Sequence, residues 1–305
     1  MHRVPTVTKV LALIGAGICL LGPCRVQADW GFDATAGLAY DDNLSNSLEA
    51  DDRKPDSAFT ASASGGYYQQ LGTNTGVGLA LLAETTDYMH YTGLTNLGLG
   101  ARAQLRQKFG LGADAPWAAI SAQAVHHNYH YDYRDGWAYD ATASAGKQIS
   151  ERWNIRGIVR YDRYDADQLQ TPVIPGISSA VYNVWGWNFG ASISFLLTAD
   201  DALSAGYTWR NGTVTSVDEP DYEILEYSSA VALDPVFGTS PRMVAYRIKA
   251  KTDILSLAWS HTLGRHAAVN LAYTYSLSKT GSELGNYYSN PVSYTHLTLP
   301  TNREV

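Results

Sequence analysis

Cysteine is almost absent from this sequence of 305 residues, which contains two, Cys19 and Cys24. Both fall in an opening segment with the pattern of an export signal, in which basic residues precede the apolar run Val10–Leu21. Val26–Ala28 then offers a cleavage site. We therefore expect a signal peptide over residues 1–28, cleaved after Ala28, and a mature chain without disulfides.

Long apolar runs and an excess of positive charge are also missing. After the signal, no apolar run approaches the roughly 20 residues that a membrane-spanning helix needs. The net charge is −7, so nucleic acid is not an expected partner. A soluble protein would fit these absences. A membrane barrel fits them as well, because only alternate residues of its strands face lipid.

What the chain does have is a period-two alternation over most of its length. One face of the stretch Thr95–Phe109 is apolar, with Gln107 as its exception. The other face carries small, amide and basic residues, namely Asn96, Gly98, Gly100, Arg102, Gln104, Arg106 and Lys108. Successive side chains of a strand point to opposite faces. The pattern therefore predicts a strand with lipid on one side and water on the other.

Eleven such segments predict an all-β, antiparallel, up-and-down transmembrane barrel. They are Trp30–Asp41, Asp56–Leu71, Thr75–Met89, Thr95–Phe109, Trp117–Tyr131, Gly136–Ile149, Trp153–Asp165, Tyr182–Leu197, Ala202–Thr215, Met243–Leu263 and His266–Thr280. Their connections alternate between tight turns, such as Gly72–Asn74, and longer loops, such as Ser216–Arg242. Outer-membrane barrels have short turns on the periplasmic side and long loops outside.

Aromatic residues gather near the predicted strand ends, as in the two girdles of a membrane barrel. On the turn side are Trp30, Phe32, Phe109, Trp117, Trp153, Phe195 and Trp259. On the loop side are Tyr40, Tyr88, Tyr129, Trp137, Tyr139, Tyr161, Trp185, Trp187, Tyr207, Trp209, Tyr246 and Tyr275.

The end of the sequence breaks the pattern. Val292–Val305 resembles a translated sequencing adapter, and neither of its faces is consistently apolar. Pro300 also disfavours a strand. Because bacterial barrels have even strand numbers, we expect about 12 strands, with 11 native strands present and the last one missing. The predicted division is a signal peptide at 1–28, a C-terminally truncated barrel at 29–291 and an adapter-derived tail at 292–305.

The polar faces of the strands predict a lumen in which cations outnumber acids. Its candidate selectivity residues are Arg102, Arg106, Arg156, Arg160, Arg210, Arg247, Lys249 and Lys251. Lys249 and Lys251 fall on the same face of the predicted strand as Leu255 and Leu257. Either a bulge between them or a protrusion of the strand beyond the bilayer is therefore expected. A charged stripe sets the selectivity of a pore, which predicts passage of small anionic solutes. A salt-bridged, closed structural barrel is the alternative.

We expect no enzyme, cofactor, catalytic residue or metal site. His126, His127 and His130 cluster at a predicted strand end, but His127 faces the opposite way from the other two. Three-way metal ligation would need a bend there. No serine nearby lies in a persuasive nucleophile motif.

Ala39–Leu44, with the sequence AYDDNL, resembles a broad group of outer-membrane β-barrel proteins. This group includes the barrel domains of surface lipoprotein assembly modifiers and of exopolysaccharide-associated barrel proteins. The resemblance implies a barrel in the outer membrane of a Gram-negative bacterium, with membrane lipid as a partner. It also implies the alternative function, a structural or assembly and export barrel for surface polysaccharide or lipoprotein with no open pore. The oligomeric state is left open.

Overall fold

The computed structural model describes residues 28–47, 49, 51–112, 114–240, 242–264, 267–280 and 286–301. Over these ranges the chain forms one antiparallel sheet of 13 strands. The expected signal peptide lies outside the described residues except for Ala28, where the first strand begins.

Eleven strands of the described chain match the predicted segments to within a few residues. They are β1 (Ala28–Asp41), β2 (Asp56–Gln70), β3 (Thr75–Tyr88), β4 (Asn96–Lys108), β5 (Trp117–Tyr129), β6 (Gly136–Gln148), β7 (Trp153–Ala166), β8 (Val184–Leu196), β9 (Asp201–Asp218), β11 (Val244–Thr262) and β12 (Ala268–Thr280). Each pairs with its neighbours in antiparallel register, and β9 pairs with β11. The prediction of an antiparallel barrel is confirmed.

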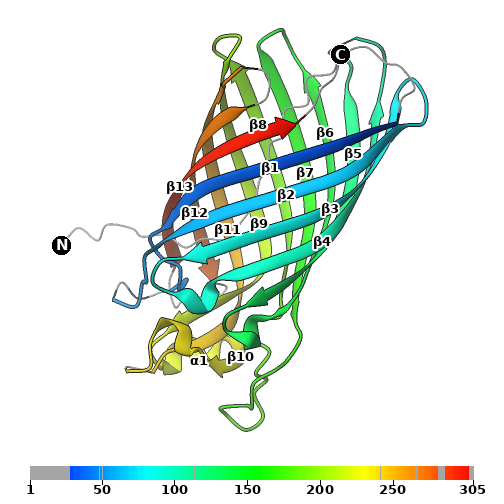
Figure 1. Ribbon diagram of the computed structural model, residues 1–305. Helices are drawn as coiled ribbons and strands as arrows, with labels where there is room; N and C mark the ends of the chain where they lie inside the picture. The colour runs from blue at the N-terminus through cyan, green and yellow to red at the C-terminus, as the bar shows by residue number, and fades with distance from the viewer. Residues whose placement is uncertain are drawn as a thin grey trace, which may run out of the picture.

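A further strand, β13 (Asn286–Thr301), lies between β12 and β1 and closes the ring (Figure 1). Twelve described strands therefore form the ring, in agreement with the predicted size. The prediction that Val292–Val305 holds no strand is wrong, because residues 292–301 belong to β13. Backbone pairing is independent of side-chain identity, so a segment of suitable length can join the edges of β12 and β1. The adapter origin of this segment stays a prediction.

Both prolines of β13 occupy positions that tolerate a missing N–H group. Pro291 lies where the register with β12 shifts, between the pairs Thr274↔Val292 and Ser276↔Ser289. Pro300 lies opposite Asp33 of β1, beyond the last pair with β12, Ala268↔Thr298. At Pro300 the backbone of β13 therefore pairs with β1 alone, and the missing N–H group removes no hydrogen bond to β12.

The ring has an apolar outer face. Leu81 on β3, Leu99 on β4 and Ile120 on β5 are exposed and share this face, and Trp30 and Trp187 lie on it towards opposite ends. A closed ring leaves no unpaired sheet edge, and an apolar exterior suits lipid. None of the helices in the described chain is long and apolar enough to cross a membrane.

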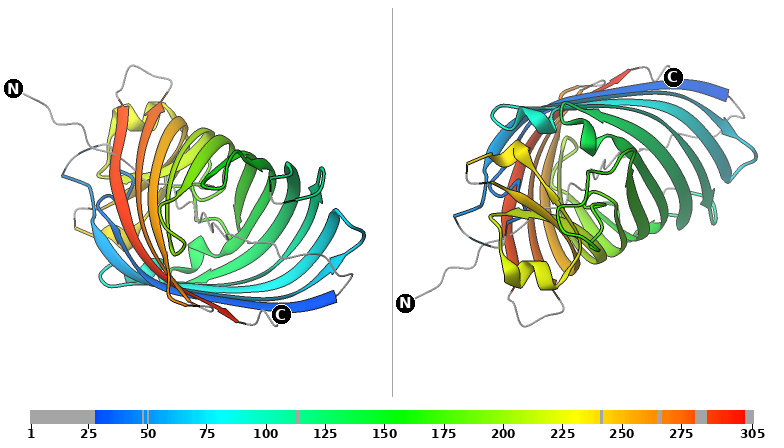
Figure 2. Two further views of the ribbon diagram at one scale, coloured as in Figure 1. Left: turned by 90° about the horizontal axis from the view of Figure 1, so that it is seen from above. Right: turned by 90° about the horizontal axis from the view of Figure 1, so that it is seen from below.

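At the loop end, β9 and β11 continue past the ring and gain a short partner. β10 (Ser228–Leu233) pairs with the first residues of β11, and α1 (Tyr222–Glu226) lies between β9 and β10. Short 3-10 turns lie in three other connections: η1 (Thr92–Leu94), η2 (Asp132–Arg134) and η3 (Pro235–Phe237). The view from below in Figure 2 shows these elements gathered at one mouth of the barrel.

Candidate functional site

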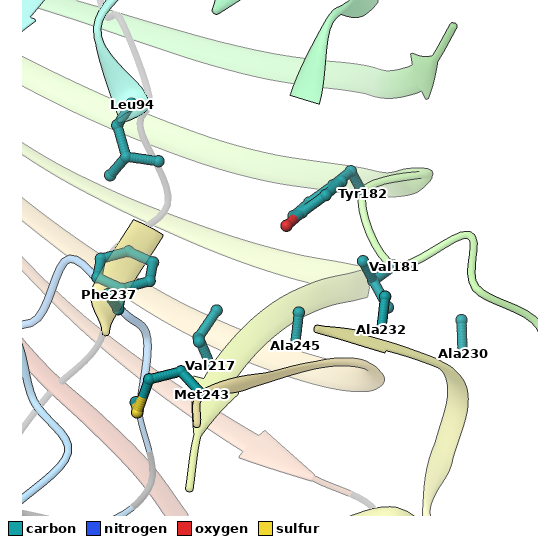
Figure 3. Close-up of a cluster of buried hydrophobic side chains, with 9 residues drawn as sticks. All are labelled: Leu94, Val181, Tyr182, Val217, Ala230, Ala232, Phe237, Met243 and Ala245. Atoms are coloured by element: carbon teal, nitrogen blue, oxygen red, sulfur yellow. The ribbon is translucent and has the colours of Figure 1, made fainter. Parts of the chain in front are cut away.

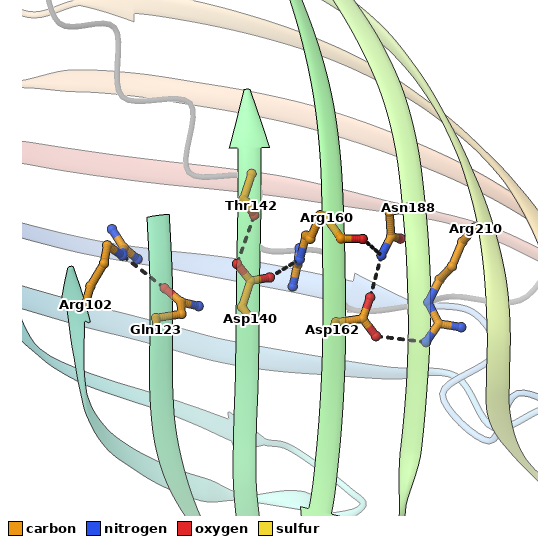
Figure 4. A network of polar contacts seen from close by, with 8 residues as sticks. All are labelled: Arg102, Gln123, Asp140, Thr142, Arg160, Asp162, Asn188 and Arg210. Carbon is orange, nitrogen blue, oxygen red and sulfur yellow. Dashed lines mark hydrogen bonds and ion pairs between the residues drawn. The ribbon is translucent and has the colours of Figure 1, made fainter. Parts of the chain in front are cut away.

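A row of polar side chains crosses the inner wall of the barrel from β4 to β9 (Figure 4). Its members are direct cross-strand neighbours, so period-two alternation on each strand places them on the same face. The pairs Arg102↔Gln123, Gln123↔Asp140, Asp140↔Asp162, Arg160↔Asn188 and Asn188↔Arg210 define this polar belt.

The two arginines of the polar belt on β7 and β9 are ion-paired. Arg160 contacts Asp140, which also accepts a hydrogen bond from Thr142. Arg210 Nη2 lies 2.9 Å from Asp162 Oδ2, and its side chain is only 2% exposed. Gly186 makes room for it, because a Cβ there would lie 2.5 Å from the guanidinium carbon. Much of the positive charge of these two residues is therefore balanced locally.

Unlike Arg160 and Arg210, the arginines on β4 and at the turn end of β7 contact neutral side chains. Arg102 donates through Nε to Gln123 Oε1 at 3.0 Å and is exposed although it faces inward, which indicates water-accessible space inside the ring. The guanidinium carbons of Arg106 and Arg156 lie 4.5 and 5.9 Å from the ring centre of Trp117. Within the described chain, no acidic side chain forms an ion pair with Arg106 or Arg156.

Lys249 and Lys251 do not line the lumen, and the prediction that they do is wrong. The register of β11 with β9 runs without a shift from Val244 to His261. Lys249, Lys251, Leu255 and Leu257 therefore share one face, and all four are exposed. Thr252, on the other face, is buried and pairs with Arg210 of the polar belt. β11 protrudes beyond the apolar band, so lysines and leucines occupy one outward face without a bulge.

Arg247 also lies away from the lumen wall, in the loop-end extension. Its Nη1 donates to the backbone oxygens of Ala180 and Asn183, and its Nε donates to Ser229 Oγ at 2.9 Å. These contacts join the loop before β8 to the start of β11, so Arg247 holds the loops together.

The mouth cap is our name for the apolar cluster in Figure 3, which joins loops from across the barrel. Its buried members are Leu94, Val181, Tyr182, Val217, Ala230, Ala232, Phe237, Met243 and Ala245. The rings of Tyr91 and Phe237 pack against each other at an angle of 50°, with ring centres 5.1 Å apart. Because η1 follows β3 and η3 precedes β11, this contact connects nearly opposite sides of the ring. The segment around η3 thus crosses the loop-end mouth.

A buried ion pair fastens the mouth cap. Arg134 of η2 contacts Asp234, whose side chain is fully buried. The guanidinium also lies 4.4 Å from the ring centre of Tyr182. Burial is the largest influence on the pKa of Arg134 and would lower it, but the Asp234 carboxylate and the neighbouring Tyr182 and Tyr129 together outweigh burial, and the pKa is raised. Burial likewise raises the pKa of Tyr131 to about 12. The cap is therefore held by apolar contacts together with a permanent cation.

His126 and His127, which strand alternation places on opposite faces of β5, contact different carboxylates. His126 Nε2 lies 2.7 Å from Asp167 Oδ2, whereas His127 Nε2 lies 3.4 Å from Glu84 Oε1 on the lumen side. No group of three or more His, Cys, Asp or Glu side chains suited to a metal ion occurs in the described chain.

Sequence reasoning missed the lumen positions of Trp117 and Gln123 and the loop contact between Arg134 and Asp234. Trp117 shares its parity with Ser121 and Gln123 on β5, so the alternation could have placed it inside. Tyr129 shares this inward parity, and Tyr246 is buried in the extension, so neither belongs to the loop-side girdle. No local signal links Arg134 to Asp234.

The closed ring, apolar exterior and polar, partly solvent-accessible interior define a transmembrane β-barrel. No family model and no curated protein match the sequence. Among solved structures, an outer-membrane channel from Pseudomonas putida F1 is similar at 10% identity with a TM-score of 0.58, over 91% of this chain and 96% of that one. The NanC porin is similar at 10% identity and a TM-score of 0.45, over 89% and 100% of the two chains. At this identity the first similarity shows the barrel fold.

Proposed function

We propose that the protein is an outer-membrane channel through which small solutes pass, with a preference for anions. The observation that carries this proposal is the pair Arg106 and Arg156, which flank Trp117 on the inner wall without an acidic partner in the described chain. An unbalanced cation on a pore wall attracts anions and repels cations. Arg102, exposed and hydrogen-bonded to a neutral amide, adds to the same effect.

The fold similarity supports the same proposal, since the Pseudomonas structure is an outer-membrane channel. We place the turns in the periplasm and the loops outside, with membrane lipid around the apolar face. No catalytic step and no cofactor is part of this function.

The proposal is tested by ion selectivity in planar bilayers under a salt gradient. We expect a reversal potential of the sign for anion preference in the unaltered protein. The double variant Arg106→Glu and Arg156→Glu should reverse that sign, because two wall charges change together. Lys147→Glu is the matched control, since Lys147 is exposed on the outer face at the same end of the barrel. Cation preference in the unaltered protein would overturn the proposal.

The second candidate is a structural or export barrel with no open pore, and the mouth cap is the observation that favours it. Apolar contacts of Phe237 and the Arg134–Asp234 pair join loops from several sides of the ring. This function predicts a silent bilayer for both the unaltered protein and Arg134→Met, whose cap lacks the ion pair. Stable conductance in the unaltered protein rejects this candidate.

A further inference from the structure

Three lysines lie together on the outer face of the barrel at the loop end. Lys249 and Lys251 lie two residues apart on β11, and Lys279 lies directly opposite Lys251 on β12. All three are exposed. Together they form what we call the lysine patch.

Like charges directly opposite each other destabilise a pair of strands. Asp253 offsets part of this repulsion, because its Oδ2 lies 3.4 Å from Lys279 Nζ and its Oδ1 accepts a hydrogen bond from Tyr207 at 2.6 Å. Within the described chain, no acidic side chain pairs with Lys249 or Lys251. The patch thus keeps a positive excess in a chain whose net charge is −7, and an anion bound between the lysines would relieve their repulsion.

The position of the patch points to the source of that anion. Further along the same face of β11, Leu255 and Leu257 are 50% and 58% exposed, and Tyr207 beside them is 45% exposed. A strand rises about 3.3 Å per residue, so Lys251 lies about 13 Å along the strand from Leu255. A tilt of about 40° reduces this distance to about 10 Å of height. The lysines therefore lie beside the polar headgroup layer, above the hydrocarbon.

We propose that Lys249, Lys251 and Lys279 bind the phosphate groups of a lipid headgroup in the leaflet at the loop end. An ammonium group is a compact point charge that binds phosphate well and attracts anionic lipid at a membrane surface. Asp253 and Tyr207 fix the position of Lys279, and Lys249 and Lys251 provide the unbalanced charge. This inference does not depend on whether the lumen conducts.

Two other outward cations serve as comparisons. Arg163 on β7 lies 2.7 Å from Asp165 on the same strand, so its charge is already balanced. Lys147 on β6 is exposed on the outer face at the turn end, far along the strand from the loop-end headgroups. Neither is part of an opposed lysine pair.

The test measures lipid binding to the purified full-length protein in detergent by native mass spectrometry. The probe is a diphosphorylated diglucosamine lipid, and its dephosphorylated form is the comparison. For the triple variant Lys249→Gln, Lys251→Gln and Lys279→Gln we expect about 10- to 100-fold weaker binding of the phosphorylated lipid. Lys147→Gln and Arg163→Gln should bind like the unaltered protein.

A charge-preserving variant separates charge from folding. The triple Lys→Arg variant should retain binding, and all variants should keep the heat-modifiable electrophoretic mobility of a folded barrel. The proposal is overturned if the unaltered protein does not bind the phosphorylated lipid, if both lipid forms bind equally, or if the folded triple Gln variant binds as tightly as the unaltered protein.

Discussion

In the middle of the lumen, Arg160 and Arg210 each lie against an aspartate, whereas nearer the turns Arg106 and Arg156 lie against the ring of Trp117. All four are arginines on the same inner wall, yet they contribute differently to the electrostatic potential in the lumen. A paired arginine contributes to stability and little to the potential along the axis, while an arginine over an aromatic ring keeps its charge. The number of cations in a lumen therefore says less about selectivity than the partner of each one.

The largest expected effect is the loss of stability when a buried arginine loses its aspartate partner. Asp162→Ala should lower the free energy of unfolding by about 3–5 kcal/mol, because it leaves a buried guanidinium without its partner. The measurement is urea unfolding in detergent, followed by tryptophan fluorescence. Asp165→Ala is the matched control, since its partner Arg163 is 54% exposed and an exposed pair contributes about 0–1 kcal/mol. Equal losses in the two variants would contradict the distinction.

A medium effect should appear when a paired arginine is released. Asp140→Ala leaves Arg160 on the wall without its carboxylate. We expect stronger anion preference, by about fivefold or about 1 kcal/mol for an ion passing within 4 Å. The measurement is the permeability ratio from the reversal potential. Gln123→Ala, which alters the same polar belt without changing its charge, should leave the ratio near that of the unaltered protein. A permeability ratio shifted towards cations after Asp140→Ala would contradict the distinction between paired and unpaired arginines.

The sequence predicted the strands because their alternation is a local property. Each predicted segment contained enough period-two repeats to fix which residues share a face, and Arg102, Arg106, Arg156, Arg160 and Arg210 all fall on the predicted inner face. Their role in selectivity stays a prediction.

What the sequence could not predict depends on where the membrane lies and on contacts distant in sequence. For Lys251 and Leu255, which share a face, the sequence left a bulge and a protrusion of the strand both open, and only the unshifted register of β11 with β9 excludes the bulge. The pairing of Arg134 with Asp234 joins residues 100 positions apart. The place of β13 in the ring depends on two strand edges that need partners rather than on its own alternation.

The smallest expected effect concerns the arginines without an acidic partner and tests their contact with the ring of Trp117. If the ring of Trp117 supports Arg106 through its face, Arg106→Met and Trp117→Leu should be coupled in a double-mutant cycle by about 0.5–1 kcal/mol of unfolding free energy. Arg156, whose guanidinium carbon is 5.9 Å from the ring centre rather than 4.5 Å, should show weaker coupling in the parallel cycle. Additive effects in the Arg106 cycle would mean that the ring fills space without holding the cation. The selectivity of Trp117→Leu should stay anionic in either case, because the charge itself remains on the wall.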